Sequence, residues 1–427
     1  MLVTFYDSYS VLSKIYSEGA FIKQALNGTI IEEKNRKTTT KICYGVLDKD
    51  ITLSYIIKKL SSKTPKSAIR IVLKISLYSI IYLNTPAHAV INTAVELVKK
   101  MGKGGMAGFV NALLRNYVRA PIILPNGSDA FSLSIKYSYP EFAVKKLIDG
   151  YGEKTAIDII SYDTENTYVR FNKGVDGENY LKTNGYNYET TPFNNLFSVL
   201  GFKMDGGFYE GLYTFQSIGS VAICNGVLAS EKGDILEDFS AKRLLDVCSA
   251  PGGKSVYLAD YFSSVTACEL HNHRAELINS YASRMGKTNV TVCVKDATEF
   301  DDSFVNSYDV VLVDAPCSGM GVIKDNPDIK LNRSEADILG LVKTQLDILN
   351  NVSKYVKKGG YLCYSTCSVL RDENDGVISK FLQSNEDFIE VKVKSNLNCV
   401  NLPYGNAFLP NISGGAGFYF VKLKKIN

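Results

Sequence analysis

The sequence predicts a multidomain protein with an all-α N-terminal domain, a small α+β linker module and a C-terminal α/β domain of the Rossmann-like type. Residues 1–120 contain few Gly and Pro and repeat apolar residues at three- and four-residue spacing, as amphipathic helices do. A mixed segment rich in Tyr, Asn and Gly follows, and from about residue 240 apolar strands alternate with helical stretches. The predicted boundaries are 1–125, 126–235 and 236–427.

One helix of the N-terminal domain is well delimited in "NTPAHAVINTAVELVKKMG", residues 84–102. Thr85 can cap its start, Pro86 suits the first helical position, and Gly102 marks its end after two lysines. The topology of the middle module does not follow from its sequence pattern.

The C-terminal domain contains short, nearly continuous apolar runs separated by helical stretches such as residues 334–356. This pattern predicts a parallel sheet covered by helices on both faces, a doubly wound domain that binds ligands at the carboxyl ends of its strands. The runs are "RLLDV", "SVTACEL", "NVTVCVKD", "YDVVLVDAP" and "GGYLCYST".

Charge is divided unequally along the chain of 427 residues, whose net charge is +4. Residues 1–120 contain 18 Lys and Arg against 7 Asp and Glu, a net charge of +11, whereas the remainder contains 30 against 37, a net charge of −7. A basic domain on a weakly acidic body indicates contact with nucleic-acid phosphates. A solvated lysine-rich surface explains the same composition.

Cellular location and metal content follow from the cysteines, the histidines and the first residues. The start "MLVTFYDSYS" lacks the basic and then apolar layout of a signal peptide, so we expect a cytoplasmic protein with no membrane contact. Nine cysteines without repeated spacing predict free thiols rather than a disulfide framework. With three histidines and no CxxC pair, we expect no metal site.

A glycine-rich turn, "LLDVCSAPGGKS" at residues 244–255, follows the first predicted strand. Gly252 and Gly253 allow close approach of the backbone to a nucleotide-like ligand. Gly253, Lys254 and Ser255 also match the end of a phosphate-binding loop, but Cys248 stands where that motif requires its first glycine.

Two acidic residues end the next strands and favour a different ligand. Glu269 ends the second strand, where it can accept hydrogen bonds from both hydroxyls of a ribose. Asp296 ends the third strand and can accept from an adenine amino group. Adenosine without phosphates fits both residues, and the positive sulfonium of S-adenosylmethionine suits an acidic site, so we predict this cofactor.

Cys317 and Cys367 follow the fourth and fifth strands and are expected to face the same site. Two thiols beside a methyl donor suggest methylation of cytosine C5, because addition of a thiolate at C6 makes C5 nucleophilic. Asp314 can act as the general acid toward N3, and a second base must remove the C5 proton. An unperturbed thiol is only about 3% ionised at pH 7, so Lys254 or nearby helix N-termini are expected to lower the nucleophile's pKa.

The motifs "CSAPGGK", "DAPCSGMGVIKDNPDIK" and "YSTCSVLRDEN", in this order, resemble those of the RsmB (Sun/Fmu) branch of the Nop2/Sun family of RNA cytosine-5 methyltransferases. The stretches "PAHAVINTAVELVK" and "FVNALLR" resemble the NusB-like RNA-binding domain that marks this branch. The chain departs from the family pattern at Phe142, Ser217 and Ala416.

The resemblance implies a role for each site residue. Cys367 is the nucleophile, Cys317 assists elimination of the product, and Asp314 contacts both the target base and the cofactor. The remaining cofactor-binding residues are Cys248, Ser249, Ala250, Pro251, Gly252, Gly253, Lys254, Glu269 and Asp296.

The implied substrate is 16S ribosomal RNA, free or in early assembly, with cytosine 967 as the target and the middle module as an RNA-recognition or linker element. We expect the enzyme to be a monomer. A P-loop enzyme that uses the Gly253–Ser255 stretch, and an inactive RNA-binding protein, remain as alternatives.

Overall fold

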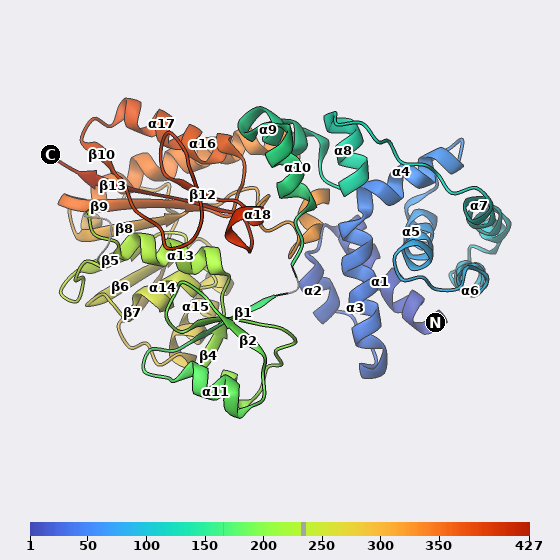
Figure 1. Cartoon of the computed structure of the whole chain (residues 1–427), viewed down its shortest axis with the longest axis horizontal. Helices are drawn as coiled ribbons and strands as arrows, with labels where there is room; N and C mark the ends of the chain where they lie inside the picture. The colour runs from blue at the N-terminus through green and yellow to red at the C-terminus, as the bar shows by residue number, and fades with distance from the viewer. Residues whose placement is uncertain (165, 232–235) are drawn as a thin grey trace. The chain divides into compact units, whose positions relative to one another are not determined.

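The computed structural model describes residues 1–164, 166–231 and 236–427. The chain forms two compact units, one of residues 1–161 with 323–334 and the other of residues 162–322 with 335–427 (Figure 1). No helix in the described part of the chain is long and apolar enough to cross a membrane.

The first unit is helical, as the sequence predicts. Its core consists of buried aliphatic side chains contributed by the first seven α-helices, among them Leu12, Val46, Leu73 and Val98, none of which is exposed. The helices are α1 (Leu2–Glu18), α2 (Ile22–Asn27), α3 (Glu33–Asp48), α4 (Asp50–Leu60), α5 (Ser67–Ile81), α6 (Ala87–Lys100), α7 (Ala107–Arg119), α8 (Ala130–Tyr137), α9 (Glu141–Tyr151) and α10 (Glu153–Ser161), with a 3-10 turn η1 (Gly104–Met106).

The predicted start of α6 is wrong by one residue. Pro86, with a ψ of 122°, is the N-cap, and no side chain caps the helix. The backbone N–H of Thr85 instead donates to the carbonyl of Ser79, 3.0 Å away, which closes the turn after α5. Proline therefore stands just before the helix rather than in its first turn.

The segment 323–334, which follows the predicted cysteine loop, belongs to the helical unit. It contains the 3-10 helix η3 (Pro327–Leu331), whose Lys330 ammonium donates to the Asp48 carboxylate at 2.9 Å and to the Asp48 carbonyl at 2.6 Å. Burial lowers the pKa of Lys330 to about 8. Burial raises the pKa of Asp48, but the charges of Lys330, Lys49 and Lys324 together outweigh it and lower that pKa to about 2. Asp328 also accepts a hydrogen bond from the backbone of Ile22.

The second unit begins with a small antiparallel sheet in the order β2-β3-β1-β4. Its strands are β1 (Thr167–Phe171), β2 (Tyr188–Thr190), β3 (Leu196–Val199) and β4 (Tyr213–Phe215), and its helices are α11 (Gly177–Thr183), α12 (Gly206–Tyr209) and α13 (Ile218–Leu228). Aromatic rings fill its core, where the ring centroids of Phe171 and Tyr213 lie 5.7 Å apart. An α+β module thus follows residue 161, whereas residues 126–161, which the sequence assigned to the middle module, belong to the helical unit because they form α8 to α10.

The large sheet has the order β11-β12-β13-β9-β8-β5-β6-β7, with β10 paired to β13. The five predicted strands are present as β5 (Arg243–Asp246), β6 (Ser264–Glu269), β7 (Val290–Val294), β8 (Tyr308–Asp314) and β9 (Val356–Thr366), all parallel to their neighbours within this set. Sequence order reverses between β5 and β8, which is the switch point where ligands bind.

Helices cover both faces of the large sheet (Figure 1). On one face lie α13, α14 (Gly253–Leu258) and α15 (Asn272–Arg284), and on the other α16 (Glu335–Val352) and α17 (Asp375–Ser384). The sequence did not predict the antiparallel strands β10 (Phe388–Val391), β11 (Val400–Asn401), β12 (Asn406–Phe408) and β13 (Phe418–Lys425), nor the short helix α18 (Pro410–Ser413).

Candidate functional site

The carboxyl ends of the parallel strands surround a cavity of about 470 Å³ in the second unit. Residues from each predicted motif line it: Val247, Cys248, Ala250, Glu269, Leu270, His271, Arg274, Lys295, Asp296, Ala297, Thr298, Asp314, Ala315, Pro316, Cys317, Thr344, Ile348 and Cys367. Segments more than 100 residues apart in the sequence therefore meet at one edge of the sheet.

The glycine-rich turn between β5 and α14 requires glycine at one position. Gly252 has a φ of +104°, and a Cβ there would lie 3.2 Å from Ile278 Cγ2 and 3.3 Å from Ile278 Cα. The turn is closed by hydrogen bonds from Gly252 N to the Ser249 carbonyl at 2.7 Å and from Ser249 N to the Cys268 carbonyl at 2.9 Å. Of the segment 248–254, Cys248 and Ala250 line the cavity.

Asp246, at the end of β5, is a buried carboxyl that the sequence did not single out. One of its oxygens accepts from the Ser255 hydroxyl at 2.5 Å, and the other has no hydrogen-bond partner within the part of the chain that the structure describes. Burial raises its pKa to about 6.

Glu269 and Asp296 both line the cavity, as predicted. Glu269 is 3% exposed and accepts from Arg274 at 3.2 Å and from the backbone N–H of His271 at 3.3 Å. Asp296 accepts from the Thr298 hydroxyl and backbone N–H, which lower its pKa. The cavity thus contains two carboxylates that can accept hydrogen bonds from a ligand.

Lys254 and Asp314 form an ion pair of 2.6 Å between the first turn of α14 and the end of β8. The other oxygen of Asp314 accepts from the Ser365 hydroxyl on β9 at 2.8 Å. Burial lowers the pKa of Lys254, but the Asp314 carboxylate outweighs burial and the net pKa is raised. Since Lys254 is held by Asp314 rather than directed to a phosphate, the site differs from a P-loop.

The sulfurs of Cys317 and Cys367 are 2.9 Å apart, at the ends of the adjacent strands β8 and β9. The hydrogen bond to Cys367 and burial raise the pKa of Cys317, and either sulfur can donate in this pair. Burial also raises the pKa of Cys248, which keeps that third cysteine protonated.

Sequence reasoning missed three partners of these residues. Besides Ser365, Gln216 donates from its amide to the Gly253 carbonyl at 3.2 Å, and Glu373 is completely buried against the loops that hold the two cysteines. Glu373 lies six residues after Cys367 in the motif "YSTCSVLRDEN". A carboxylate so close to the predicted nucleophile could have been predicted to act on the site. Ser217, a departure from the family pattern, accepts from the backbone of Ser220 and caps α13.

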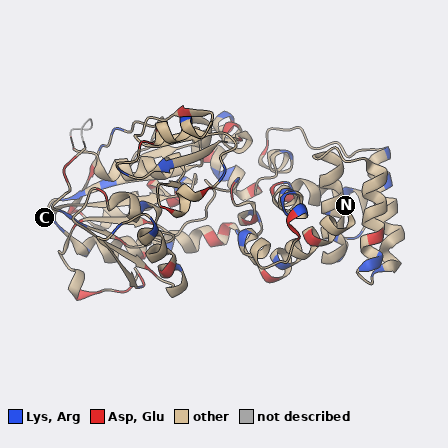
Figure 2. Cartoon of the chain, turned by 90° about the horizontal axis from the view of Figure 1, so that it is seen from below, with Lys and Arg blue, Asp and Glu red and all other residues tan. Residues whose placement is uncertain are grey.

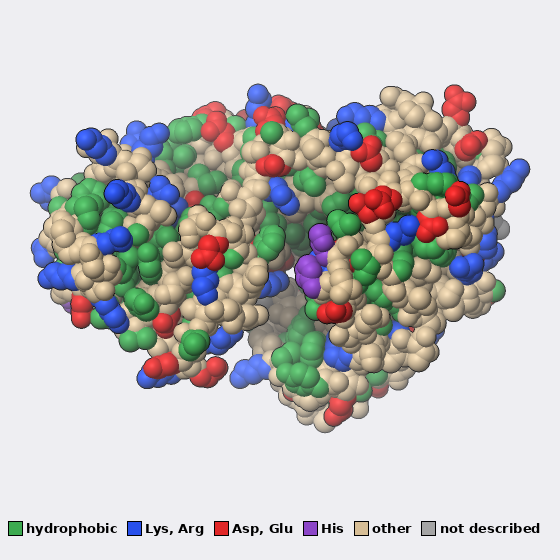
Figure 3. All heavy atoms as spheres, turned by 180° about the vertical axis from the view of Figure 1, so that it is seen from behind, with side chains coloured by type: hydrophobic (Ala, Val, Ile, Leu, Met, Phe, Trp, Pro, Cys, Tyr) green, Lys and Arg blue, Asp and Glu red, His purple; other side chains and the backbone are tan. Residues whose placement is uncertain are grey.

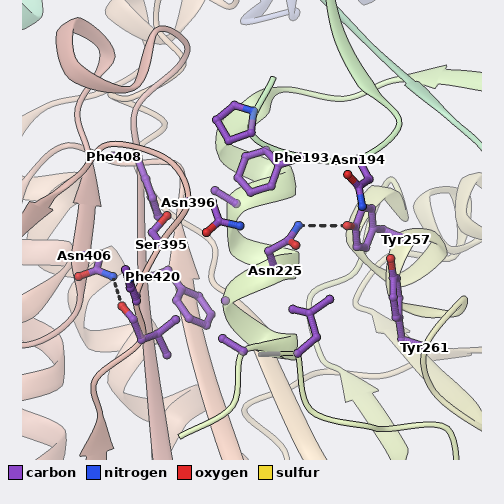
Figure 4. A pocket seen from close by; sticks show the side chains of 17 residues that line it. Phe193, Asn194, Asn225, Tyr257, Tyr261, Ser395, Asn396, Asn406, Phe408 and Phe420 are labelled. Carbon is purple, nitrogen blue, oxygen red and sulfur yellow. Dashed lines mark hydrogen bonds between the residues drawn. The ribbon is translucent and has the colours of Figure 1, made fainter. Parts of the chain in front are cut away.

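A second cavity of about 230 Å³ lies between the small and large sheets of the second unit. The side chains of Asn225, Ser395 and Asn396 point into it (Figure 4). Asn225 donates to the Tyr257 hydroxyl at 3.0 Å, and Asn406 donates to the Val393 carbonyl at 3.0 Å (Figure 4). Neither catalytic cysteine candidate nor any predicted cofactor residue lines this cavity.

Basic and hydrophobic side chains lie among one another on the helical unit (Figure 3). Lys63, Lys66 and Lys103 border a surface cavity of about 820 Å³ together with Met106 and Phe109. The second unit instead intersperses acidic and basic residues along its strands and helices (Figure 2).

Comparison with known proteins agrees with this geometry. A family model described as "16S rRNA methyltransferase RsmB/F" matches residues 234–424, and the NusB family model matches residues 8–119. The "Probable ribosomal RNA small subunit methyltransferase B" of Bacillus subtilis is 31% identical and aligns over 95% of this chain and 94% of its own. The chain belongs to the ribosomal RNA small subunit methyltransferase B family. The Photorhabdus laumondii member is 28% identical over 92% of both chains.

Solved structures share the fold. The protein PH0851 has a TM-score of 0.82 at 21% identity and covers all of this chain and 99% of its own. A methyltransferase homolog from Pyrococcus horikoshii has a TM-score of 0.59 at 21% identity and covers 70% of this chain and all of its own. The predicted fold class, with its NusB-like helical domain, is confirmed, and membership of a methyltransferase family confirms S-adenosylmethionine as the cofactor.

We expect Gly252→Ala to lower the free energy of unfolding by about 1–3 kcal/mol, because alanine at this φ is strained and its Cβ crowds Ile278. Thermal unfolding measures this loss, and calorimetry with S-adenosylmethionine should show weaker binding. Gly253→Ala is the matched control, since its Cβ would lie 3.6 Å from the nearest atom. Equal stability of the two variants would contradict the assigned strain.

Proposed function

We propose that this protein transfers a methyl group from S-adenosylmethionine to C5 of one cytosine in 16S ribosomal RNA, cytosine 967, through a covalent bond between Cys367 and C6. The observation that carries the proposal is the 2.9 Å approach of two cysteine sulfurs inside the cavity lined by Glu269, Asp296 and Asp314. Two thiols beside a methyl donor suit C5 chemistry, in which one sulfur must attack and a second group must release the product. The names of the relatives specify small-subunit ribosomal RNA.

In the proposed reaction, the Cys367 thiol passes its proton to water and its sulfur forms a bond to C6, while N3 takes a proton from Asp314 and the ring electrons make C5 nucleophilic. Bound S-adenosylmethionine supplies the methyl group that C5 takes up. Cys317, after its own proton has passed to water, accepts the C5 proton, the bond between C6 and Cys367 breaks as the C5–C6 double bond forms again, and N3 returns its proton to Asp314. The raised pKa of Cys317 supports its role as the base, because a thiol that holds its proton more tightly is the stronger base once it is ionised.

Asp314 and Lys254 act on the ring and on the cofactor. An Asp314 carboxylate paired with Lys254 at 2.6 Å leaves the shared proton on the lysine. Asp314 therefore serves as general acid toward N3 by passing on a proton that it takes from Lys254. The turn of residues 248–254, with Glu269 and Asp296, holds the cofactor.

The three predicted parts divide this work. Residues 1–125, with their excess of positive charge, bind RNA phosphates, residues 126–235 form an RNA-recognition or linker module, and residues 236–427 carry out methyl transfer. The proposed enzyme is a cytoplasmic monomer that acts on free or early-assembly RNA. Methylation of 16S ribosomal RNA with labelled cofactor, followed by bisulfite sequencing, tests the whole proposal, and ATP binding without methylation would support a P-loop enzyme instead.

The two cysteines are expected to give opposite phenotypes. Cys317→Ala should accumulate a protein–RNA adduct that survives denaturing electrophoresis, because attack and methylation proceed while removal of the C5 proton is hindered. Cys367→Ala should bind RNA and cofactor yet form no adduct and transfer no methyl group. An adduct that forms only in Cys367→Ala would reverse the roles, and full turnover by both variants would refute covalent catalysis.

Glu269→Ala should weaken cofactor binding by about 1.5–3 kcal/mol, since the ribose hydroxyls lose a charged acceptor. Isothermal calorimetry measures this loss, and RNA affinity should stay the same. Glu276→Ala, on the exposed face of α15 nearby, is the control and should bind the cofactor as the wild type does. Wild-type affinity in Glu269→Ala would remove Glu269 from the cofactor site.

Replacing Lys63, Lys66 and Lys103 together with Gln should weaken RNA binding and reduce the slope of log affinity against log salt by about 2 to 3, because each phosphate contact contributes about 0.7–0.9. Fluorescence anisotropy at several salt concentrations measures the slope. The control replaces Lys358, Lys380 and Lys392 of the second unit with Gln, which removes the same amount of positive charge. If both triple variants shift the slope equally, the helical unit holds no special RNA surface.

A further inference from the structure

The side chain of Glu373 joins the two loops that hold the cysteine pair. Its carboxylate accepts from the Ser318 backbone N–H at 2.8 Å, from the Ser318 hydroxyl at 2.5 Å and from the Ser368 hydroxyl at 2.6 Å. Ser318 and Ser368 directly follow Cys317 and Cys367 in the chain. One carboxylate therefore contacts the residue next to each sulfur, across a sequence separation of 50 residues.

Glu373 is completely buried in the short 3-10 helix η5 (Arg371–Glu373). The Gln345 amide on α16 supplies a further donor at 3.2 Å and also donates to the Pro316 carbonyl at 2.9 Å, just before Cys317. These donors are neutral N–H and O–H groups whose positions are fixed by the carboxylate they share. An amide or a methyl group in place of this carboxylate cannot accept from all of them.

Asn374, the next residue, binds the end of β9 from the same side. Its carbonyl oxygen accepts from the Thr366 hydroxyl at 2.6 Å, and its amide donates to the Ser368 carbonyl at 3.0 Å. The backbone carbonyl of Glu373 accepts from the Tyr364 hydroxyl at 2.7 Å. The residues on both sides of Cys367 are thus bound to one short stretch of chain, while Cys367 itself remains open to the cavity.

The negative charge of Glu373 also distinguishes the two sulfurs. Beyond the hydrogen bond to Cys367 and burial, the Glu373 carboxylate contributes to raising the pKa of Cys317. A fixed like charge disfavours the thiolate form of Cys317.

We propose that Glu373 is a positioning residue for the cysteine pair: by holding Ser318 and Ser368 on one carboxylate, it fixes the two sulfurs 2.9 Å apart. This inference rests on the proposed covalent mechanism, to which it adds the group that holds the two cysteine loops together. Glu373 itself lines no part of the cavity and touches no substrate.

The test is Glu373→Gln, which preserves the shape of the side chain and removes its charge. In the full-length protein without RNA, iodoacetamide alkylation of Cys317 and Cys367 is followed by peptide mass spectrometry as a function of pH. We expect the midpoint for Cys317 to fall by about one pH unit, because the substitution removes a negative charge that opposes ionisation of this thiol. Methyl transfer should show kcat reduced on the order of 100-fold with unchanged KM for RNA and unchanged cofactor affinity.

Asp375→Asn is the matched control, because Asp375 is a buried carboxyl two residues away that pairs with Arg371. It should leave the alkylation midpoints and kcat as in the wild type. Ser368→Ala removes one hydroxyl donor and keeps the carboxylate, so its kcat should fall by less than that of Glu373→Gln. It also provides a second measurement if Glu373→Gln is too unstable to purify.

Unchanged alkylation midpoints and unchanged kcat in Glu373→Gln would overturn the inference. If Glu373→Gln cannot be purified, a wild-type kcat in Ser368→Ala would overturn it. Either result would leave the proposed reaction intact if Cys317→Ala still traps RNA. Full turnover by both cysteine variants would instead refute the covalent mechanism, while the alkylation midpoints report on Glu373 independently.

Discussion

The ion pair between Lys254 and Asp314 is the contact on which the rest of the site depends. It ties the first turn of α14, and so the glycine-rich turn before it, to the end of β8, while Ser365 extends the link to β9. The Lys254 ammonium also lies 5.7 Å from the centre of the Phe418 ring on β13. A buried ion pair adds little net stability, but breaking it leaves an unpaired charge, so the three segments are held in one arrangement.

Much of the fold follows from local pattern. The runs that end at Asp246, Glu269 and Asp314 are apolar throughout because helices cover both sides of their strands, and sequence identifies them without tertiary knowledge. The strand β13 was not predicted, because its sequence is not continuously apolar. Its Lys422 is completely buried, donating to the carbonyls of Val227 and Ala229, and a lysine inside a strand is ordinarily taken as solvent-facing.

The candidate site, like the fold, was predictable from sequence only in part. Residues at strand ends, such as Glu269 and Cys317, could be placed from sequence because the topology of a doubly wound sheet brings strand ends together. The partners that give these residues their chemistry could not, because side-chain contacts between distant loops leave no periodic signal. Lys254 shows the difference: sequence indicated a cation near the thiols, whereas its main partner is the Asp314 carboxylate.

The return of residues 323–334 to the helical unit changes how this protein can be divided. The chain passes between the two units after residue 161, after residue 322 and again after residue 334, so no single cut separates them. Truncation before residue 162 would leave Lys330 without the carboxylate and carbonyl of Asp48, and Asp328 without the backbone of Ile22. Removal of residues 1–161 would therefore leave one segment of the helical unit, residues 323–334, attached to the second unit with the buried charges of Lys330 and Asp328 unpartnered by these groups.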